Sequence, residues 1–119
     1  MTRFMMFFLA ALLMAGPCHA ALKVVGKGDK VTFDPTGFPP QMKASWEIMK
    51  TKCVRCHSME RTVVSITTGV ASVSGQPFDH NATRAYGLKM MRKPESNMSR
   101  YEIKAVVDLM NYMLDESAR

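Results

Sequence analysis

Cysteine is scarce in this chain of 119 residues, which contains only Cys18, Cys53 and Cys56. Disulfide-rich small domains need several cysteine pairs, so a disulfide framework is excluded. Cys53 and Cys56 are separated by two residues, and a bridge that closes so short a loop is usually redox-active rather than structural. The pair is therefore not expected to act as an ordinary staple of the fold.

Long apolar runs are also absent, apart from residues 4–15. This run is shorter than the roughly 18–20 residues that a membrane span needs. Arg3 precedes it, and small or helix-breaking residues follow it up to Ala20, so residues 1–20 are predicted to be a cleaved secretory signal peptide. A retained membrane anchor is one alternative. A lipoprotein anchored at Cys18 is another, which Pro17 disfavours.

The exported chain would run from Ala21 to Arg119 and form one small domain. Its net charge would be +5, because the signal removes one basic residue from a total of +6. A core of this size is marginal without a staple such as a metal or a cofactor. No internal repeat is evident.

The sequence Cys53-Val54-Arg55-Cys56-His57 has the CxxCH pattern of covalent haem attachment. The two thiols can add to the two vinyl groups of a haem, and the two-residue spacer matches the separation of those vinyls. The next residue is then carried beneath the ring, where a histidine nitrogen can bind iron. The motif occurs once, so it predicts a single haem c bound by Cys53 and Cys56, with His57 as an iron ligand.

Two other uses of these residues are chemically conceivable. A thioredoxin-like dithiol would need a βαβ context, which the sequence lacks. A zinc site could in principle use Cys53, Cys56, His57 and His80, but adjacent Cys56 and His57 would form a tetrahedral site awkwardly. Both are weaker interpretations than haem attachment.

The remaining segments predict an all-α fold with an extended N-terminal arm. Residues 21–40 contain short β-prone runs and turns, and form either a small hairpin or a surface arm. Residues 58–76 are mostly small and polar and predict a loop after at most one helical turn. Helices are expected at residues 41–52, at 81–91 with Asp79 or Asn81 as cap, and after Ser99, where Glu102 completes a capping box. The apolar stripe of the last helix consists of Ile103, Val106, Val107, Met110, Met113 and Leu114.

Motif and layout together resemble the class I monohaem cytochromes c of bacterial periplasms, over about residues 43–113. The resemblance implies a cytochrome c domain at residues 41–119, with N- and C-terminal helices packed around one covalent haem. It also implies a steep helix crossing at a small residue and a large apolar residue, positions held here by Ser45 and Met49. The family often uses a proline carbonyl soon after CxxCH to orient the histidine, whereas here no proline follows until Pro77.

The resemblance further implies a methionine as second axial ligand, from the loop before the last helix. Counting back from Lys93-Pro94 indicates Met90, while helical phase with Leu88 makes Met91 the alternative. Met98 matches an apolar residue that the family places before the helix cap, and is expected in the core. Generic use of methionine as a core residue is the competing explanation for all three.

With His57 and a methionine on the iron, no position is open for a substrate, and methionine raises the reduction potential relative to histidine. The sequence therefore predicts a periplasmic electron carrier and not an enzyme. One alternative is a low-potential haem with His80 as its second histidine ligand. Another is a five-coordinate haem that serves as a gas sensor or peroxidase.

Basic residues flank both parts of the expected haem site: Lys50, Lys52, Arg55, Lys89, Arg92 and Lys93. If they surround the haem edge, they would steer acidic redox partner proteins by long-range attraction. If not, they are ordinary solvated helix faces. Export makes nucleic acid a poor candidate partner. The chain is expected to be a monomer with at most peripheral membrane contact.

Overall fold

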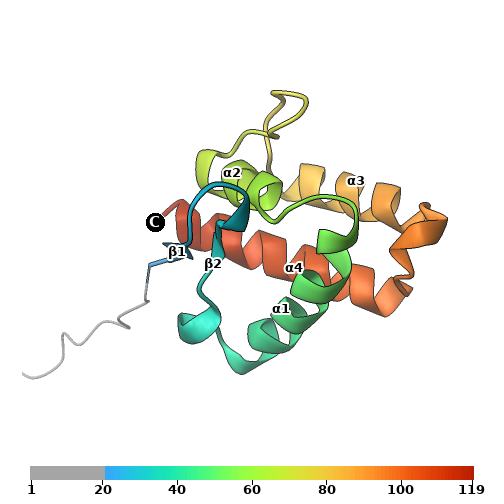
Figure 1. The fold of residues 1–119 in the computed structure, drawn as a ribbon, viewed down its shortest axis with the longest axis horizontal. Coiled ribbons are helices and arrows are strands. Elements are labelled where there is room, and N and C mark those ends of the chain that lie inside the picture. Colours follow the sequence, from blue (N-terminus) through green and yellow to red (C-terminus); the bar gives the residue numbers. More distant parts are fainter. Residues whose placement is uncertain (1–20) are drawn as a thin grey trace, which may run out of the picture.

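The computed structural model describes residues 21–119, which form a small, mostly helical fold. The helices are α1 (Pro40–Lys52), α2 (Glu60–Thr68), α3 (His80–Met91) and α4 (Arg100–Ser117), preceded by a hairpin of β1 (Val24–Val25) and β2 (Thr32–Phe33). Figure 1 shows α4 as the central helix, with α1 crossing it and α3 running beside it. The helix content agrees with the expected all-α fold. The expected signal peptide, residues 1–20, lies outside the described residues.

Residues 21–40 pack onto the helices through aromatic rings. The strands pair antiparallel, with Val24 opposite Phe33. Phe33 and Phe38 each make an edge-to-face contact with Trp46 of α1, at centroid distances of 6.3 and 6.1 Å. Phe38 also meets Tyr112 of α4 at 5.5 Å. Because such pairs add to the stabilisation from burial, the arm is part of the core rather than a loose extension.

The two positions at which the resemblance places the crossing of α1 and α4 are both buried. Ser45 and Met49 are buried on α1, and the hydroxyl of Ser45 donates to the Gln41 carbonyl oxygen within its own helix. On α4, Val106 and Met110 are buried in the same core. A small residue beside a large one lets the two helices approach closely, as ridge-into-groove packing requires.

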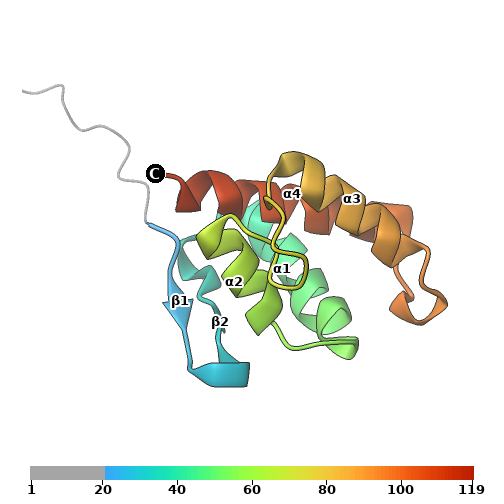
Figure 2. The ribbon, with the colours of Figure 1, turned by 90° about the horizontal axis from the view of Figure 1, so that it is seen from above.

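The antiparallel pair of α3 and α4 is closest at Gly87. A Cβ atom at this position would lie 2.6 Å from Cγ2 of Val107 and 3.3 Å from Cγ2 of Ile103. The same pair is joined by a buried hydrogen bond from the Thr83 hydroxyl to Oδ1 of Asn111, at 2.6 Å. Figure 2 shows α3 lying along α4 from above. Glycine is thus required by the close approach and not by its backbone angles.

Helix α2 corrects the expectation of a loop across residues 58–76. Its residues are rich in β-branched side chains, which lowers intrinsic helix propensity. Burial of Val63 and Ile66 in the core outweighs that cost, and the Thr67 and Thr68 hydroxyls donate to carbonyl oxygens one turn earlier. Gly69 ends the helix at φ 69°, in the left-handed conformation that glycine adopts without strain.

The two remaining helix starts are capped as the sequence predicts. Oδ1 of Asp79 accepts a hydrogen bond from the Ala82 backbone N–H at 2.9 Å and begins α3. Ser99 and Glu102 form the reciprocal capping box of α4. Within residues 21–119, no helix combines the length and the hydropathy needed to cross a membrane.

Candidate functional site

The two cysteines follow α1 directly and lie in different surroundings. Cys53 begins the short 3-10 turn η3 (Cys53–Arg55) and packs against the core, whereas Cys56 is exposed. Burial raises the pKa of the Cys53 thiol to about 11, and the neighbouring Cys56 adds to the shift. Both thiols are free. A raised pKa disfavours the thiolate, so Cys53 in this environment is a poor nucleophile.

His57 is half-buried, and its ring is oriented by a backbone carbonyl. Nδ1 lies 2.8 Å from the carbonyl oxygen of Ser58. Because a carbonyl oxygen can only accept, Nδ1 must carry the proton, which leaves Nε2 with a free lone pair. No described residue bonds to Nε2. The Ser58 carbonyl is therefore the group that orients the His57 ring.

A cavity of about 500 Å³ lies between the end of α1 and the loop that precedes α4. Its walls include Lys52 on one side and residues around the turn η4 (Pro94–Ser96) on the other, namely Lys93, Pro94, Ser96, Asn97 and Ser99. Cys53, Cys56 and His57 are not among the lining residues. Two methionines, Met91 and Met98, also line it. Met90 is half-buried and is not among the lining residues, while Met98 also packs against the core.

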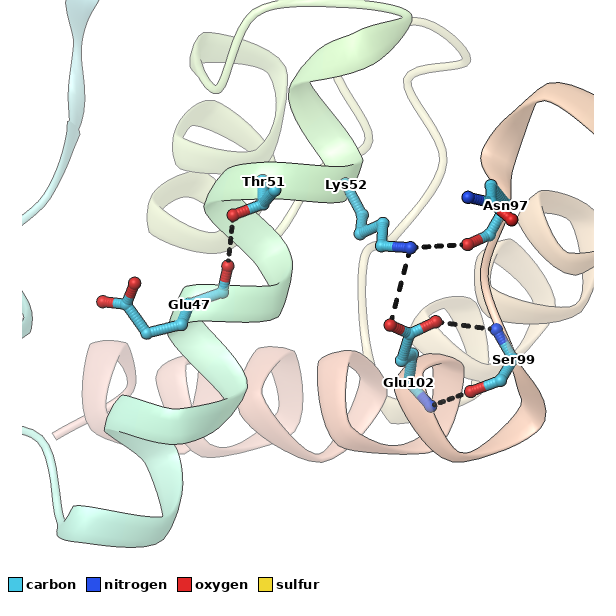
Figure 3. A network of polar contacts seen from close by, with 6 residues as sticks. All are labelled: Glu47, Thr51, Lys52, Asn97, Ser99 and Glu102. Atoms are coloured by element: carbon cyan, nitrogen blue, oxygen red, sulfur yellow. Dashed lines mark hydrogen bonds and ion pairs between the residues drawn. The ribbon is translucent and has the colours of Figure 1, made fainter.

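One polar network connects the two sides of this cavity (Figure 3). The ammonium group of Lys52 donates to the carbonyl oxygen of Asn97 at 2.7 Å, and lies 3.6 Å from a carboxylate oxygen of Glu102. The other carboxylate oxygen of Glu102 accepts from the Ser99 backbone N–H at 2.8 Å. That backbone hydrogen bond is the main reason why the pKa of Glu102 lies below its usual value, with Lys52 lowering it further.

Cys53, Cys56 and His57 are neighbours along the chain, whereas the structure places His80 elsewhere. His80 is exposed at the first residue of α3, where its Nε2 lies 2.9 Å from Oδ1 of Asp115 near the end of α4. Met91 ends α3, so about 16 Å of helix separates His80 from the methionines. In the part of the chain that is described, no three His, Cys, Asp or Glu side chains gather as a metal site. The proposed four-residue zinc site is therefore not assembled.

The basic residues around the site divide into two groups. Lys52 is bound to the opposite wall, and Lys50 pairs with Glu47 of its own helix at 2.8 Å. The other basic residues are exposed, and none has an ion-pair partner among residues 21–119: Arg55, Lys89, Arg92 and Lys93. These four are the charges that remain available to a partner.

Sequence reasoning missed two contacts at the site. Ser58 acts through its backbone, which any residue could provide, so no sequence signal identifies it. Lys52 meets Asn97 across 45 positions of chain, and a lysine at the end of a helix is ordinarily explained by the helix dipole. The only available signal was its place directly before Cys53.

Comparison with known proteins gave no match. No protein-family model, curated protein sequence or solved structure is similar to this chain at a significant level.

Proposed function

We propose that this protein is an exported, periplasmic carrier of single electrons, with one haem c held by a cytochrome c-like fold. Cys53 and Cys56 would form the two thioethers. His57 would be one axial ligand, and Met90, or alternatively Met91, would be the other. The observation that carries the proposal is the CxxCH segment itself, with two free thiols and an imidazole whose Nε2 is unengaged.

Two observations support the proposal. Lys52, the residue before Cys53, borders a cavity of about 500 Å³ whose lining includes Met91 and Met98 but not Cys53, Cys56 or His57. The Ser58 carbonyl fixes the tautomer that presents Nε2 to a metal. A haem bound there would supply a reversible ferric–ferrous couple, whose potential is set by its ligands and its exposure. The helices α1 and α4 would hold the attachment segment, and the loop before α4 would hold the methionine.

The proposal does not include catalysis, because both axial positions would be filled by side chains. Electrons would pass through an exposed haem edge in small, transient complexes. Arg55, Lys89, Arg92 and Lys93 would attract acidic redox partners and make the association rate depend on salt concentration. Export would follow cleavage after Ala20.

Covalent attachment is the first test of the proposal. The full chain is expressed in a host that has haem-ligation machinery, and denatured protein is stained for bound haem and analysed by mass spectrometry. We expect one covalent haem on a chain that begins at Ala21. Cys56→Ala should lose one thioether and reduce the yield of haem protein sharply. The proposal is wrong if the wild-type chain leaves that host without covalent haem.

A further inference from the structure

A second hollow, of about 290 Å³, lies between the N-terminal arm and the last turns of α4. Ala21, the first residue that cleavage after Ala20 would leave, is part of its wall. Apolar and charged side chains form most of the remaining wall: Leu22, Lys23, Asp34, Phe38, Tyr112 and Glu116. Figures 1 and 2 both show the start of the arm beside the C-terminal end of α4. The hollow thus places the start of the arm next to a charged helix end.

Glu116 is a buried carboxylate in the last turn of α4. Its side chain is only 5% exposed, and its one ion-pair partner among residues 21–119 is Arg119, at 3.5 Å. That distance exceeds the roughly 2.7–2.9 Å of a charge-assisted hydrogen bond. The last turn of α4 contains no basic residue, and the negative end of the helix dipole disfavours a carboxylate there. Because a buried charge is costly without close partners, this end of α4 favours binding of a further cation.

Asp34, the other carboxylate of the hollow, is better supplied with partners. Its Oδ1 accepts from the Thr36 backbone N–H at 3.0 Å and from the Thr36 hydroxyl, and its Oδ2 lies 3.5 Å from Nζ of Lys23. The negative charge of Glu116, in contrast, acts on the hollow itself. Burial is the main reason why the pKa of the Tyr112 hydroxyl lies above its ordinary value, and Glu116 raises it further while Arg119 opposes the shift. Glu116 is therefore the carboxylate here that a new cation would stabilise most.

The start of the arm is held beside Glu116 by contacts that do not involve Ala21. The Asp34 backbone N–H donates to the carbonyl oxygen of Lys23 at 2.8 Å, and Leu22 packs against the core. Only one residue then separates the anchored Leu22 from the new N-terminus. A group on so short a tether has a high effective concentration and loses little further entropy when it binds.

We propose that Glu116 is the binding site for the α-ammonium group of the chain itself, which exists only after cleavage before Ala21. The inference rests on the proposed export and requires no haem. Hydrolysis of the Ala20–Ala21 peptide bond by a signal peptidase takes up one water. It leaves a carboxylate on Ala20 and an amine on Ala21 that is mostly protonated at neutral pH. In the uncleaved chain this nitrogen is an uncharged amide, so cleavage gives Glu116 a second cation and fastens the arm to the end of α4.

The test uses the exported protein and measures how fast an amine-reactive acylating reagent labels Ala21 near neutral pH, by mass spectrometry of the N-terminal peptide. Only the unprotonated amine reacts, so an ammonium bound to Glu116 should be labelled slowly. Glu116→Gln removes the charge and keeps the size, and should speed labelling about tenfold. Asp115→Asn is the matched control, because it removes the same charge from the neighbouring residue, whose carboxylate contacts His80 and does not line the hollow. It should be labelled at the wild-type rate.

Two further measurements keep the test decisive. Acylation of the Ala21 amine removes its charge, so it should lower the folding equilibrium constant about tenfold in the wild type and in Asp115→Asn, but change it little in Glu116→Gln. Denaturant unfolding before and after acylation measures this coupling. Arg119→Gln removes the competing cation and should slow labelling of Ala21 below the wild-type rate, and it serves if Glu116→Gln does not fold.

Failure of the inference and failure of the proposed function look different. If the exported chain begins at Ala21 but Glu116→Gln is labelled no faster than Asp115→Asn, the inference is wrong, while the electron-carrier proposal stands. If the chain carries haem but begins at another residue, the cleavage site and the inference both fail. If it begins at Ala21 without covalent haem, the electron-carrier proposal fails, and the labelling rates still decide the role of Glu116.

Discussion

The two ends of α4 are built in different ways. Toward its C-terminus, Tyr112 and Met113 belong to a dense core with the aromatic rings of Phe38 and Trp46. Near its N-terminus, Ile103 packs at Gly87 of α3, and the helix also meets the end of α1 through Lys52, beside a cavity of about 500 Å³. The first end is joined to the arm and to α1 by aromatic packing, whereas the second adds a polar contact at the residue next to Cys53.

This difference indicates where the fold is stabilised and where it acts. Apolar burial is non-directional and tolerates little empty volume. The hollow at the packed end, which is bounded by Leu22, Phe38 and Tyr112, is accordingly the smaller of the two, at about 290 Å³. The open end has the residues that a packed core would avoid, namely a charged network, a free Nε2 on His57 and thiols without partners. A haem would complete this end with apolar surface, which the chain alone does not supply.

The largest effect should come from removing the proposed methionine ligand at the open end. The resemblance to class I cytochromes c, counted back from Lys93-Pro94, implies Met90, while the cavity wall contains Met91. We expect Met90→Ala to abolish the weak far-red band that a methionine–iron bond gives, lower the reduction potential and let carbon monoxide bind the ferrous protein. Met91→Ala should keep the band and cost about 1–3 kcal/mol if its side chain packs. Optical spectra and redox titration measure both.

The reverse outcome would move the ligand to Met91 and would show that the cavity lining, rather than the motif spacing, identifies it. If both variants keep the band, Met98 is the remaining methionine on the cavity wall. A third outcome would support a bis-histidine haem instead, despite the contact between His80 and Asp115. In that case the wild type lacks the band, and only His80→Ala frees a coordination position on the iron.

At the packed end, Trp46 should matter most for stability. Its side chain is 5% exposed and lies between the rings of Phe33 and Phe38. Trp46→Ala should lower the free energy of unfolding by about 3–5 kcal/mol, because it leaves a cavity and detaches the N-terminal arm. Denaturant unfolding of the haem protein measures the loss.

The matched control lies on α4 at the open end. Tyr101 is 77% exposed in the first turn, so Tyr101→Ala should change the free energy of unfolding by less than about 0.5 kcal/mol. A large loss in Tyr101→Ala would mean that the open end carries more packing than the structure shows. A small loss in Trp46→Ala would contradict the contrast between the two ends.

The expected effect of a substitution at Gly87 on stability lies between those at Trp46 and Tyr101. Gly87→Ala would gain up to about 1 kcal/mol in helix propensity. The new Cβ would lie 2.6 Å from Cγ2 of Val107, however, and forcing α3 and α4 apart should cost about 1–3 kcal/mol. The net result should be destabilisation. Arg84→Ala, at an exposed site of the same helix, should be nearly neutral.

A double variant identifies the cause at Gly87. Val107→Ala removes the clashing methyl groups, so Gly87→Ala should cost much less when it is combined with Val107→Ala. Strictly additive losses would show that the close approach of α3 to α4 is not what requires glycine here.

Local features of the fold were readable from the sequence, while contacts between distant segments were not. The structure confirms the capping box of Ser99 and Glu102, and of the two alternatives Asp79 and Asn81 it selects Asp79 as the cap of α3. The β-branched residues of α2 hid a helix that burial of Val63 and Ile66 stabilises, since tertiary packing overrides propensity. At the candidate site, the CxxCH pattern is local and legible.

The remaining site contacts depend on the fold. Ser58 orients His57 through a backbone atom that every residue type possesses. No sequence pattern predicts the contact between Lys52 and Asn97, because a lysine can donate to any carbonyl oxygen within reach. Which methionine faces the cavity depends on where α3 ends and how the following loop turns, and a shift of one residue exchanges Met90 for Met91.

The smallest expected effect is on stability at low pH. It compares one carboxylate at each end, Glu102 at the open end and Asp34 at the packed end. The pKa of Glu102 is lowered mainly by the Ser99 N–H, and that of Asp34 is lowered mainly by the Thr36 hydroxyl. A carboxylate whose pKa is lower in the folded than in the unfolded state adds stability above the unfolded value. That contribution is lost as pH falls through the folded value.

Both Glu102→Gln and Asp34→Asn should therefore flatten the loss of stability below about pH 5, and their effects should add because the two sites are independent. Acid unfolding titrations of the wild type, the two single variants and the double variant measure these losses. Effects that do not add would show that the carboxylates at the two ends are coupled.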